Sequence, residues 1–188
     1  MRVSILVFIG VLVVISVASC LGQKLGLQPK LKGWGTYIDG TNKFSINTPP
    51  GWSVATSDRQ WMKNNEEAVS FASPDLVGSF DISIYPNPQH LSAKQWFDKD
   101  VKEAGKSWGA KWSIIAEHPI TVNGQKGYAT LMQVPDGRNK YVYFTWGGRA
   151  YMIYYSKWWT SMSPYEIQHY KSCYATQELM LKTFKSVE

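Results

Sequence analysis

The sequence predicts an α+β fold: an antiparallel β-sheet built as a meander and flanked by helices. Four strand-like segments follow one another between residues 113 and 156, and loops this short can join only antiparallel strands. Two segments, 92–105 and 163–184, place apolar residues three and four positions apart, as amphipathic helices do. An alternating run at 43–47 opens the folded part.

Three short strands are expected before the first helix. They are 43–47, 68–72 and 79–85. In the last of these, Phe80, Ile82 and Ile84 share one face, because side chains alternate along a strand. The segment Pro49-Pro50-Gly51-Trp52 predicts a tight turn after the first strand.

The first helix begins with a capping box. The hydroxyl of Ser92 accepts a backbone N–H of the first turn, and Gln95 reaches back to the cap. The apolar stripe consists of Ala93, Trp96, Phe97, Val101 and Ala104. Gly105 is expected to end the helix, whose stripe should lie on the sheet.

The meander follows this helix. Its four strands are expected at 113–122, 125–134, 140–146 and 150–156. Asn123-Gly124 is a strong type I′ turn pair, and Gly147-Gly148 predicts the last reversal.

The second helix is expected to start at a cap on Ser163, with Pro164 at the first helical position and Glu166 completing the box. Its apolar stripe consists of Tyr170, Cys173, Tyr174, Leu181 and Phe184.

The N-terminus predicts a secreted lipoprotein. Arg2 precedes an uncharged apolar run from 3 to 18, which is short for a bilayer span of about 20 residues. The run ends in Val17-Ala18-Ser19-Cys20, the pattern of a lipobox. We therefore expect cleavage before Cys20 and lipidation of its thiol, with an uncleaved anchor helix as the alternative.

This prediction divides the chain into a signal peptide (1–19), a membrane-proximal tether (20–36) and a folded domain (37–188). The protein is expected at the cell membrane, facing the extracytoplasmic side. Paired acyl chains such as palmitate hold a protein on a membrane stably, whereas one chain is marginal. The membrane is then one expected partner.

Three segments resemble the PsbP-like family. They are 44–52 (FSINTPPGW), 147–154 (GGRAYMIY) and 181–187 (LKTFKSV). The resemblance spans 37–188 and implies an α/β/α sandwich that binds proteins and lacks an active site. The family includes an extrinsic photosystem subunit and lipidated relatives. The segment Trp158–Met162 departs from a minimal family pattern.

Composition and charge argue against a nucleic-acid-binding protein. The formal net charge is +6, which favours anionic neighbours, but the basic residues are scattered and form no nucleic-acid-binding motif. With Cys20 lipidated, Cys173 has no disulfide partner. We interpret Cys173 as a small buried hydrophobe, with a reactive thiol as the alternative.

The sequence offers no catalytic, cofactor or metal signature, so we expect a protein that is not an enzyme. The three histidines, His90, His118 and His169, form no zinc-type pair. Glu117 beside His118 is interpreted as a solvated edge pair. The acidic residues of the first helix, Asp98, Asp100 and Glu103, are interpreted as its solvated face, because no calcium loop accompanies them.

The partner site is expected at Trp158 and Trp159, in a surface loop after the last strand, beside Tyr154 and Tyr155. Two adjacent side chains of an extended segment point to opposite sides, so at least one Trp should be exposed. The alternatives are a docking anchor and a cap over the sheet edge.

Two functions from different classes fit these observations. The first is a non-catalytic, lipid-anchored binding or assembly module that docks an envelope protein complex. The second is a cell-surface protein that binds a carbohydrate or small ligand on a Trp-rich face; the chain has nine Trp.

Overall fold

The computed structural model describes residues 32–58, 67–75, 78–108, 112–134, 137–159 and 164–187. The compact unit that contains the sheets spans Gly33–Glu188. The predicted signal peptide, Cys20 and the cap residue Ser163 lie outside the described residues, as does most of the predicted tether. Within the described ranges, no helix has the length and apolarity that crossing a bilayer requires.

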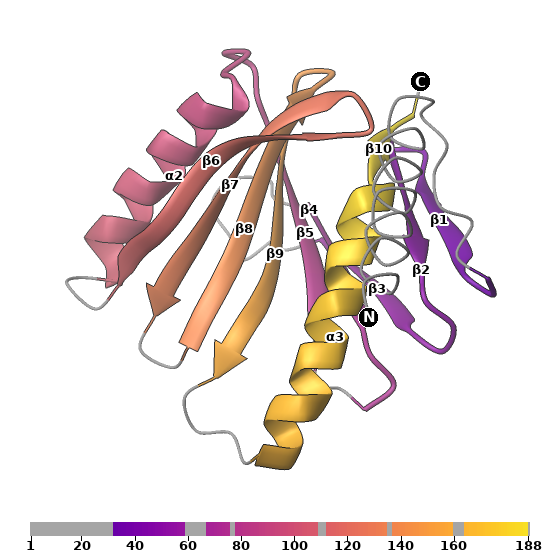
Figure 1. Ribbon diagram of the computed structural model, residues 1–188. Helices are drawn as coiled ribbons and strands as arrows, with labels where there is room; N and C mark the ends of the chain where they lie inside the picture. The colour runs from indigo at the N-terminus through magenta and orange to yellow at the C-terminus, as the bar shows by residue number, and fades with distance from the viewer. Residues whose placement is uncertain are drawn as a thin grey trace, which may run out of the picture. The chain divides into compact units, whose positions relative to one another are not determined.

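A seven-stranded antiparallel sheet forms the centre of this unit (Figure 1). In spatial order its strands are β3 (Ser53–Asp58), β4 (Glu67–Ala72), β5 (Ser79–Pro86), β9 (Arg149–Trp159), β8 (Gly137–Trp146), β7 (Gln125–Val134) and β6 (Ser113–Val122). The strands β6 to β9 pair consecutively, so the predicted meander is confirmed. The α+β class with an antiparallel sheet is therefore correct.

A smaller sheet contains β1 (Gly35–Asp39), β2 (Phe44–Thr48) and β10 (Lys185–Ser186), with β2 in the middle. The strands β1, β3 and β10 were not predicted from the sequence. They are largely exposed, so they lack the apolar alternation on which the prediction depended. The first residues of β1 fall inside the segment 20–36 that was predicted as a tether.

The two helices are α2 (Ala93–Trp108) and α3 (Pro164–Thr183). The capping box of α2 is confirmed: the Ser92 backbone N donates to Gln95 Oε1 at 2.9 Å, and the Gln95 backbone N donates to Ser92 Oγ at 3.3 Å. Gly105 does not end α2, contrary to prediction. A glycine inside a helix costs only about 1 kcal/mol relative to alanine, which the packing of the helix can offset.

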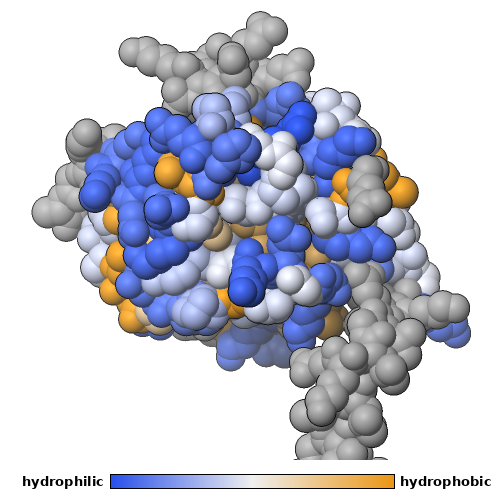
Figure 2. Space-filling model, turned by 90° about the horizontal axis from the view of Figure 1, so that it is seen from above, coloured by the Kyte–Doolittle hydropathy of each residue, from blue (hydrophilic) through white to orange (hydrophobic). Residues whose placement is uncertain are grey.

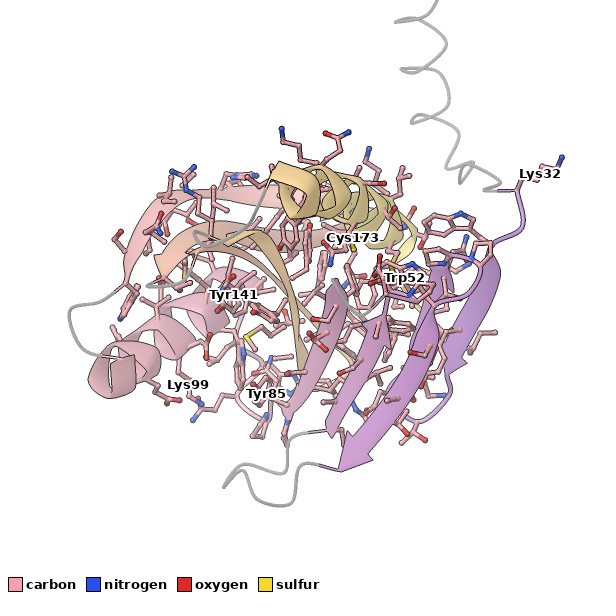
Figure 3. The ribbon with its side chains drawn as sticks, turned by 90° about the horizontal axis from the view of Figure 1, so that it is seen from below. Lys32, Trp52, Tyr85, Lys99, Tyr141 and Cys173 are labelled. Atoms are coloured by element: carbon pink, nitrogen blue, oxygen red, sulfur yellow. The ribbon has the colours of Figure 1, made fainter. Side chains whose placement is uncertain are left out.

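Alternation along the central strands gives the large sheet two buried faces. On β8, Val142 and Phe144 belong to one hydrophobic cluster, and Tyr141 and Tyr143 belong to the other. The first cluster includes Leu181 and other residues of α3, and the second includes the apolar residues of α2. The helices therefore pack on opposite faces, as Figures 1 and 3 both show.

Hairpin turns set the register of the meander. Asn123 and Gly124 both have positive φ angles, 49° and 79°, as a type I′ turn requires. The side-chain amide of Asn123 donates to the carbonyl oxygens of Lys182 and Phe184 at 2.8 and 2.9 Å. This turn residue therefore also fixes the end of α3 against the sheet.

Candidate functional site

The predicted partner-binding residues lie in one strand and not in a loop. Trp158 and Trp159 belong to β9, where they pair with Arg138 and Gly137. The prediction of a surface loop at these two residues is therefore wrong. The reason is that β8 begins at Gly137, three residues earlier than expected. Its added residues pair with Trp158 and Trp159, which extends β9. The rest of the predicted loop lies outside the described residues.

Tyr155 is fully buried between β9 and α3, so its ring is part of the core. Its hydroxyl donates to Glu178 Oε1 at 2.8 Å, and the same oxygen accepts from Lys140 Nζ at 2.6 Å. Burial, with the neighbouring Glu178 carboxylate, holds the pKa of Tyr155 far above its ordinary value. Tyr155 is therefore a neutral hydrogen-bond donor that fastens α3 and is not accessible to a partner.

Tyr154 points to the opposite face and is half-buried. There it belongs to a group that we call the tyrosine surface. The group consists of Tyr85 on β5, Tyr141 on β8, Tyr154 on β9, and Trp96 and Lys99 on α2. Figure 3 shows Tyr85 and Tyr141 on the sheet beside α2, which bears Lys99.

Ring contacts hold the tyrosine surface in a defined arrangement. The rings of Tyr141 and Tyr154 lie 5.1 Å apart between centroids, and those of Tyr85 and Trp96 lie 5.6 Å apart. The ammonium of Lys99 lies 4.7 Å from the centre of the Trp96 ring, within the range of a cation–π interaction. Tyr141 and Trp96 are 7% and 9% exposed, whereas Tyr85 and Tyr154 are half-buried. Each of the two half-buried tyrosines thus contacts one buried aromatic ring.

A second buried contact anchors α2 under this surface. The hydroxyl of Tyr143 donates to Asp100 Oδ2 at 2.7 Å, and the ring of Tyr143 lies edge-on to Phe97. Burial raises the pKa of Tyr143 well above its ordinary value, and the Asp100 charge adds to this rise. The Tyr143 hydroxyl therefore stays protonated and donates to Asp100, which fixes α2, the helix that bears Lys99, on the sheet.

Small and polar residues continue the same sheet face beyond the tyrosines. α2 packs mainly on β7 and β8, so it covers only one half of that face. By strand register, the other half is formed by Ala68, Ser70, Ala72, Ser79, Asp81 and Ser83. Of these residues Ala68 and Ser83 are buried, whereas Ser70, Ala72 and Asp81 are half-buried and Ser79 is exposed.

The residues that the sequence offered as metal ligands do not form a cluster in the described part of the chain. Among the described residues, no three or more His, Cys, Asp and Glu side chains gather so that they could hold a metal ion. His90 and His118 are both exposed; His90 lies in the connection between β5 and α2, and His118 lies on β6. The side chain of His169 lies outside the described residues.

Sequence reasoning identified Tyr154 as a site residue but missed Tyr85, Tyr141, Trp96 and Lys99. The alternation of residues 140–146 places Tyr141 and Tyr143 on the same face of their strand, and this pattern could have indicated a tyrosine-bearing face. The pairing of β5 with β9 brings Tyr85 beside this group, and that pairing joins segments far apart in the sequence. Local patterns contain no information on such a pairing.

No family model matches the sequence, and no curated protein matches it. Solved structures share its fold at low sequence identity. Cyanobacterial PsbP (CyanoP) from Synechocystis sp. PCC 6803 superposes with a TM-score of 0.59 at 12% identity, over 84% of this chain and 95% of CyanoP. The Ran-binding protein Mog1p of Saccharomyces cerevisiae superposes with a TM-score of 0.54, also at 12% identity, over 82% of this chain and 96% of Mog1p. The chain therefore has a PsbP-like fold.

Proposed function

We propose that this PsbP-like chain is a non-catalytic, lipid-anchored extracytoplasmic module that docks a protein complex of the cell envelope through the tyrosine surface. The observation that supports this function is the pair of half-buried rings, Tyr85 and Tyr154, supported by the buried Trp96 and Tyr141. One structural neighbour is a Ran-binding protein, and neither neighbour is named as an enzyme.

A protein partner fits the chemistry of this surface. Tyr and Trp are enriched at protein interfaces because they offer a large contact area with few rotatable bonds. Here the supporting rings restrict Tyr85 and Tyr154 further, which lowers the entropy lost on binding. Lys99 and Lys102 are exposed on the adjacent helix and supply a charged rim. An apolar centre with a polar rim is the usual anatomy of an interface.

The lipobox-like pattern Val17-Ala18-Ser19-Cys20 supports the location in this proposal. The segment from Cys20 to Gly33 spans at most about 47 Å when fully extended, so the domain stays near the membrane. A partner in the envelope is then within constant reach, and tethering raises its effective concentration. The formal net charge of +6 favours the attraction of the chain to an anionic membrane surface.

Co-purification tests the proposal. The full chain, extracted from native membranes with mild detergent, should retain its partner, and the Tyr154→Ser variant should lose it without a change in melting temperature. Ile115→Ser is the control, because Ile115 is 44% exposed on β6, away from the tyrosine surface. Equal recovery of the partner with Tyr154→Ser and with Ile115→Ser would rule out the tyrosine surface as the contact.

A second pair of substitutions tests the docking anchor predicted from the sequence. If Trp158 and Trp159 contact the partner, Trp158→Ser with Trp159→Ser should also abolish co-purification at an unchanged melting temperature. Both residues lie in β9, so the substitutions can also weaken the fold. If the melting temperature falls but the protein that remains folded still co-purifies with its partner, the two residues have a structural role.

Small-ligand binding is the alternative function. One observation favours it: a cavity with a volume of 330 Å³ lies at one end of the large sheet, with an acidic and a basic side chain on its walls. The chemistry of that cavity points to a specific class of ligand.

A further inference from the structure

The cavity lies beside the β8–β9 turn. Its walls include Asn42, Glu67, Ile84, Pro86, Gly148 and Arg149. Tyr85 also lines it, so the cavity adjoins the tyrosine surface. Figure 2 shows the end of the molecule to which this turn belongs, and that end is largely hydrophilic with scattered hydrophobic spots. A polar cavity on such a face suits a small polar ligand.

Glu67 is held in a fixed orientation by a buried amide. Asn42 is 3% exposed, and its Nδ2 donates to Glu67 Oε2 at 2.6 Å and to Asp39 Oδ2 at 3.1 Å. The backbone N of Asn42 also donates to Asp39 Oδ1, and its carbonyl oxygen accepts from the hydroxyl of Tyr151. A side-chain amide has two N–H donors, and both are used here. Glu67 Oε1 receives none of these bonds and can accept one from a ligand.

Arg149 supplies the opposite charge. It is half-buried, and within the described part of the chain its guanidinium has no hydrogen bond or ion pair. The guanidinium is a planar group that binds carboxylates through two parallel hydrogen bonds. An unpaired, half-buried guanidinium on a cavity wall is therefore ready to bind an anionic group.

The sheet keeps the two charges apart. Glu67 pairs with Ile84, and Arg149 pairs with Pro86, so both residues lie on the same face across three strands. Strands lie about 4.8 Å apart and each residue adds about 3.3 Å, which places the two Cα atoms about 12 Å apart. Within the described part of the chain, Glu67 and Arg149 form no ion pair with each other, although both line the cavity.

A backbone hydrogen bond and an apolar pair of residues define part of the cavity wall. The backbone N of Asn87 donates to the Gly148 carbonyl oxygen at 2.7 Å, which ties the β8–β9 turn to the end of β5. Gly147 and Gly148 have φ angles of 55° and 72°, which glycine adopts without strain. Ile84, 3% exposed, and Pro86 form the apolar part of the wall.

We propose that this cavity binds a small zwitterion of amino-acid size, with the carboxylate on Arg149 and the ammonium on Glu67. The two charges have the signs and the hydrogen-bond capacity that this class of ligand requires, and both line the same cavity. The volume of 330 Å³ is at the lower end for small-molecule sites, which suits an amino acid better than a larger metabolite. Asn42 acts as a positioning residue for Glu67.

Calorimetric titration of the full chain in a non-ionic detergent tests this proposal. The probes are L-alanine, L-glutamate and L-lysine. The tightest of them is then compared with its N-acetyl derivative, which lacks the ammonium, and with its amide, which lacks the carboxylate. We expect each derivative to bind at least about tenfold more weakly than the free amino acid.

Two variants assign the charges to their residues. Arg149→Gln should bind the amino acid about tenfold more weakly and no longer distinguish it from its amide. Glu67→Gln should no longer distinguish the amino acid from its N-acetyl derivative. The matched controls are Arg138→Gln and Glu103→Gln, the same substitutions at exposed positions away from the cavity, and they should bind as the parent does.

The outcomes separate this proposal from docking at the tyrosine surface. Tyr154→Ser should retain amino-acid binding, and Arg149→Gln should retain the protein partner. Absence of heat with all three amino acids at millimolar concentration would overturn the cavity proposal, as would equal binding of both derivatives and the free amino acid. The derivatives are titrated into the parent protein, so they test the cavity even where a variant fails to fold.

Discussion

Glu178 shows how single residues fix α3 to the sheet. Its carboxylate accepts from Lys140 and Tyr155, and Tyr174 is a third partner. Burial opposes ionisation of this carboxyl, but the bonds from Lys140 and the two tyrosines outweigh it, so the pKa of Glu178 is lowered. The folded state therefore favours the ionised form more than the unfolded state does.

The pH dependence of stability follows from this lowered pKa. The stabilisation is present above the ordinary value of 4.5 and is lost as pH falls below it. We expect Glu178→Gln to lower the free energy of unfolding at neutral pH by about 2 kcal/mol. The difference from the parent should shrink below pH 4.5 in denaturant titrations. A difference that stays constant across this range would show that the carboxylate charge is not involved.

Gly78, directly before β5, lies against Cys173 of α3. A Cβ at this position would lie 1.9 Å from Sγ of Cys173 and 3.3 Å from its Cβ. Gly78→Ala should lower the free energy of unfolding by about 1–3 kcal/mol, because the core is overpacked. In the Gly78→Ala/Cys173→Ala double variant most of this loss should be recovered, since the sulfur is gone. Additive losses in thermal or denaturant unfolding would show that α3 moves aside instead.

Phe97 provides the corresponding test of packing for α2. It is 2% exposed, and its ring centroid lies 5.1 Å from that of Tyr128 and 5.5 Å from that of Tyr143. Phe97→Ala should lower the free energy of unfolding by about 3–5 kcal/mol, through lost burial and the cavity that remains. The control Lys102→Ala changes an exposed position of the same helix and should have little effect. A denaturant midpoint for Phe97→Ala within error of the parent would contradict the packing of α2 on the sheet.

Elements with strong local signals could be predicted from the sequence, and weakly patterned ones could not. The capping box of Ser92 and the Asn123-Gly124 turn are local features, and the structure confirms both. β1 and β3 are short and exposed, so their pairing depends on contacts outside their own residues. The error at Trp158 and Trp159 has the same origin, because strand pairing with Gly137 and Arg138 extends β9.

The candidate sites depend even more than the strands on contacts between residues that are distant in the sequence. Tyr154 could be proposed from its own strand. Its proximity to Tyr141 results from the β8–β9 register, and the cavity between Glu67 and Arg149 spans strands that are remote in sequence. Sites assembled across a sheet are visible only once the strand order is known.

For the molecule as a whole, the proposed function places the folded unit outside the cytoplasm on a lipid tether. Cys20 should be the first residue of the mature chain and carry acyl groups. Mass spectrometry of the protein extracted from membranes should show loss of residues 1–19 together with added acyl mass. An intact Met1 terminus with an unmodified Cys20 thiol would contradict lipidation and leave the anchor-helix alternative.

The proposed docking function requires that the partner contact the tyrosine surface, and site-specific photo-crosslinking in native membranes detects such contact. A benzoylphenylalanine replaces Tyr154 or Tyr85 in the full chain, and Ile115, exposed on β6, serves as the control position. We expect one discrete adduct of higher mass from Tyr154 and from Tyr85, and none from Ile115. Adducts at Ile115 without adducts at the two tyrosines would contradict docking at this surface.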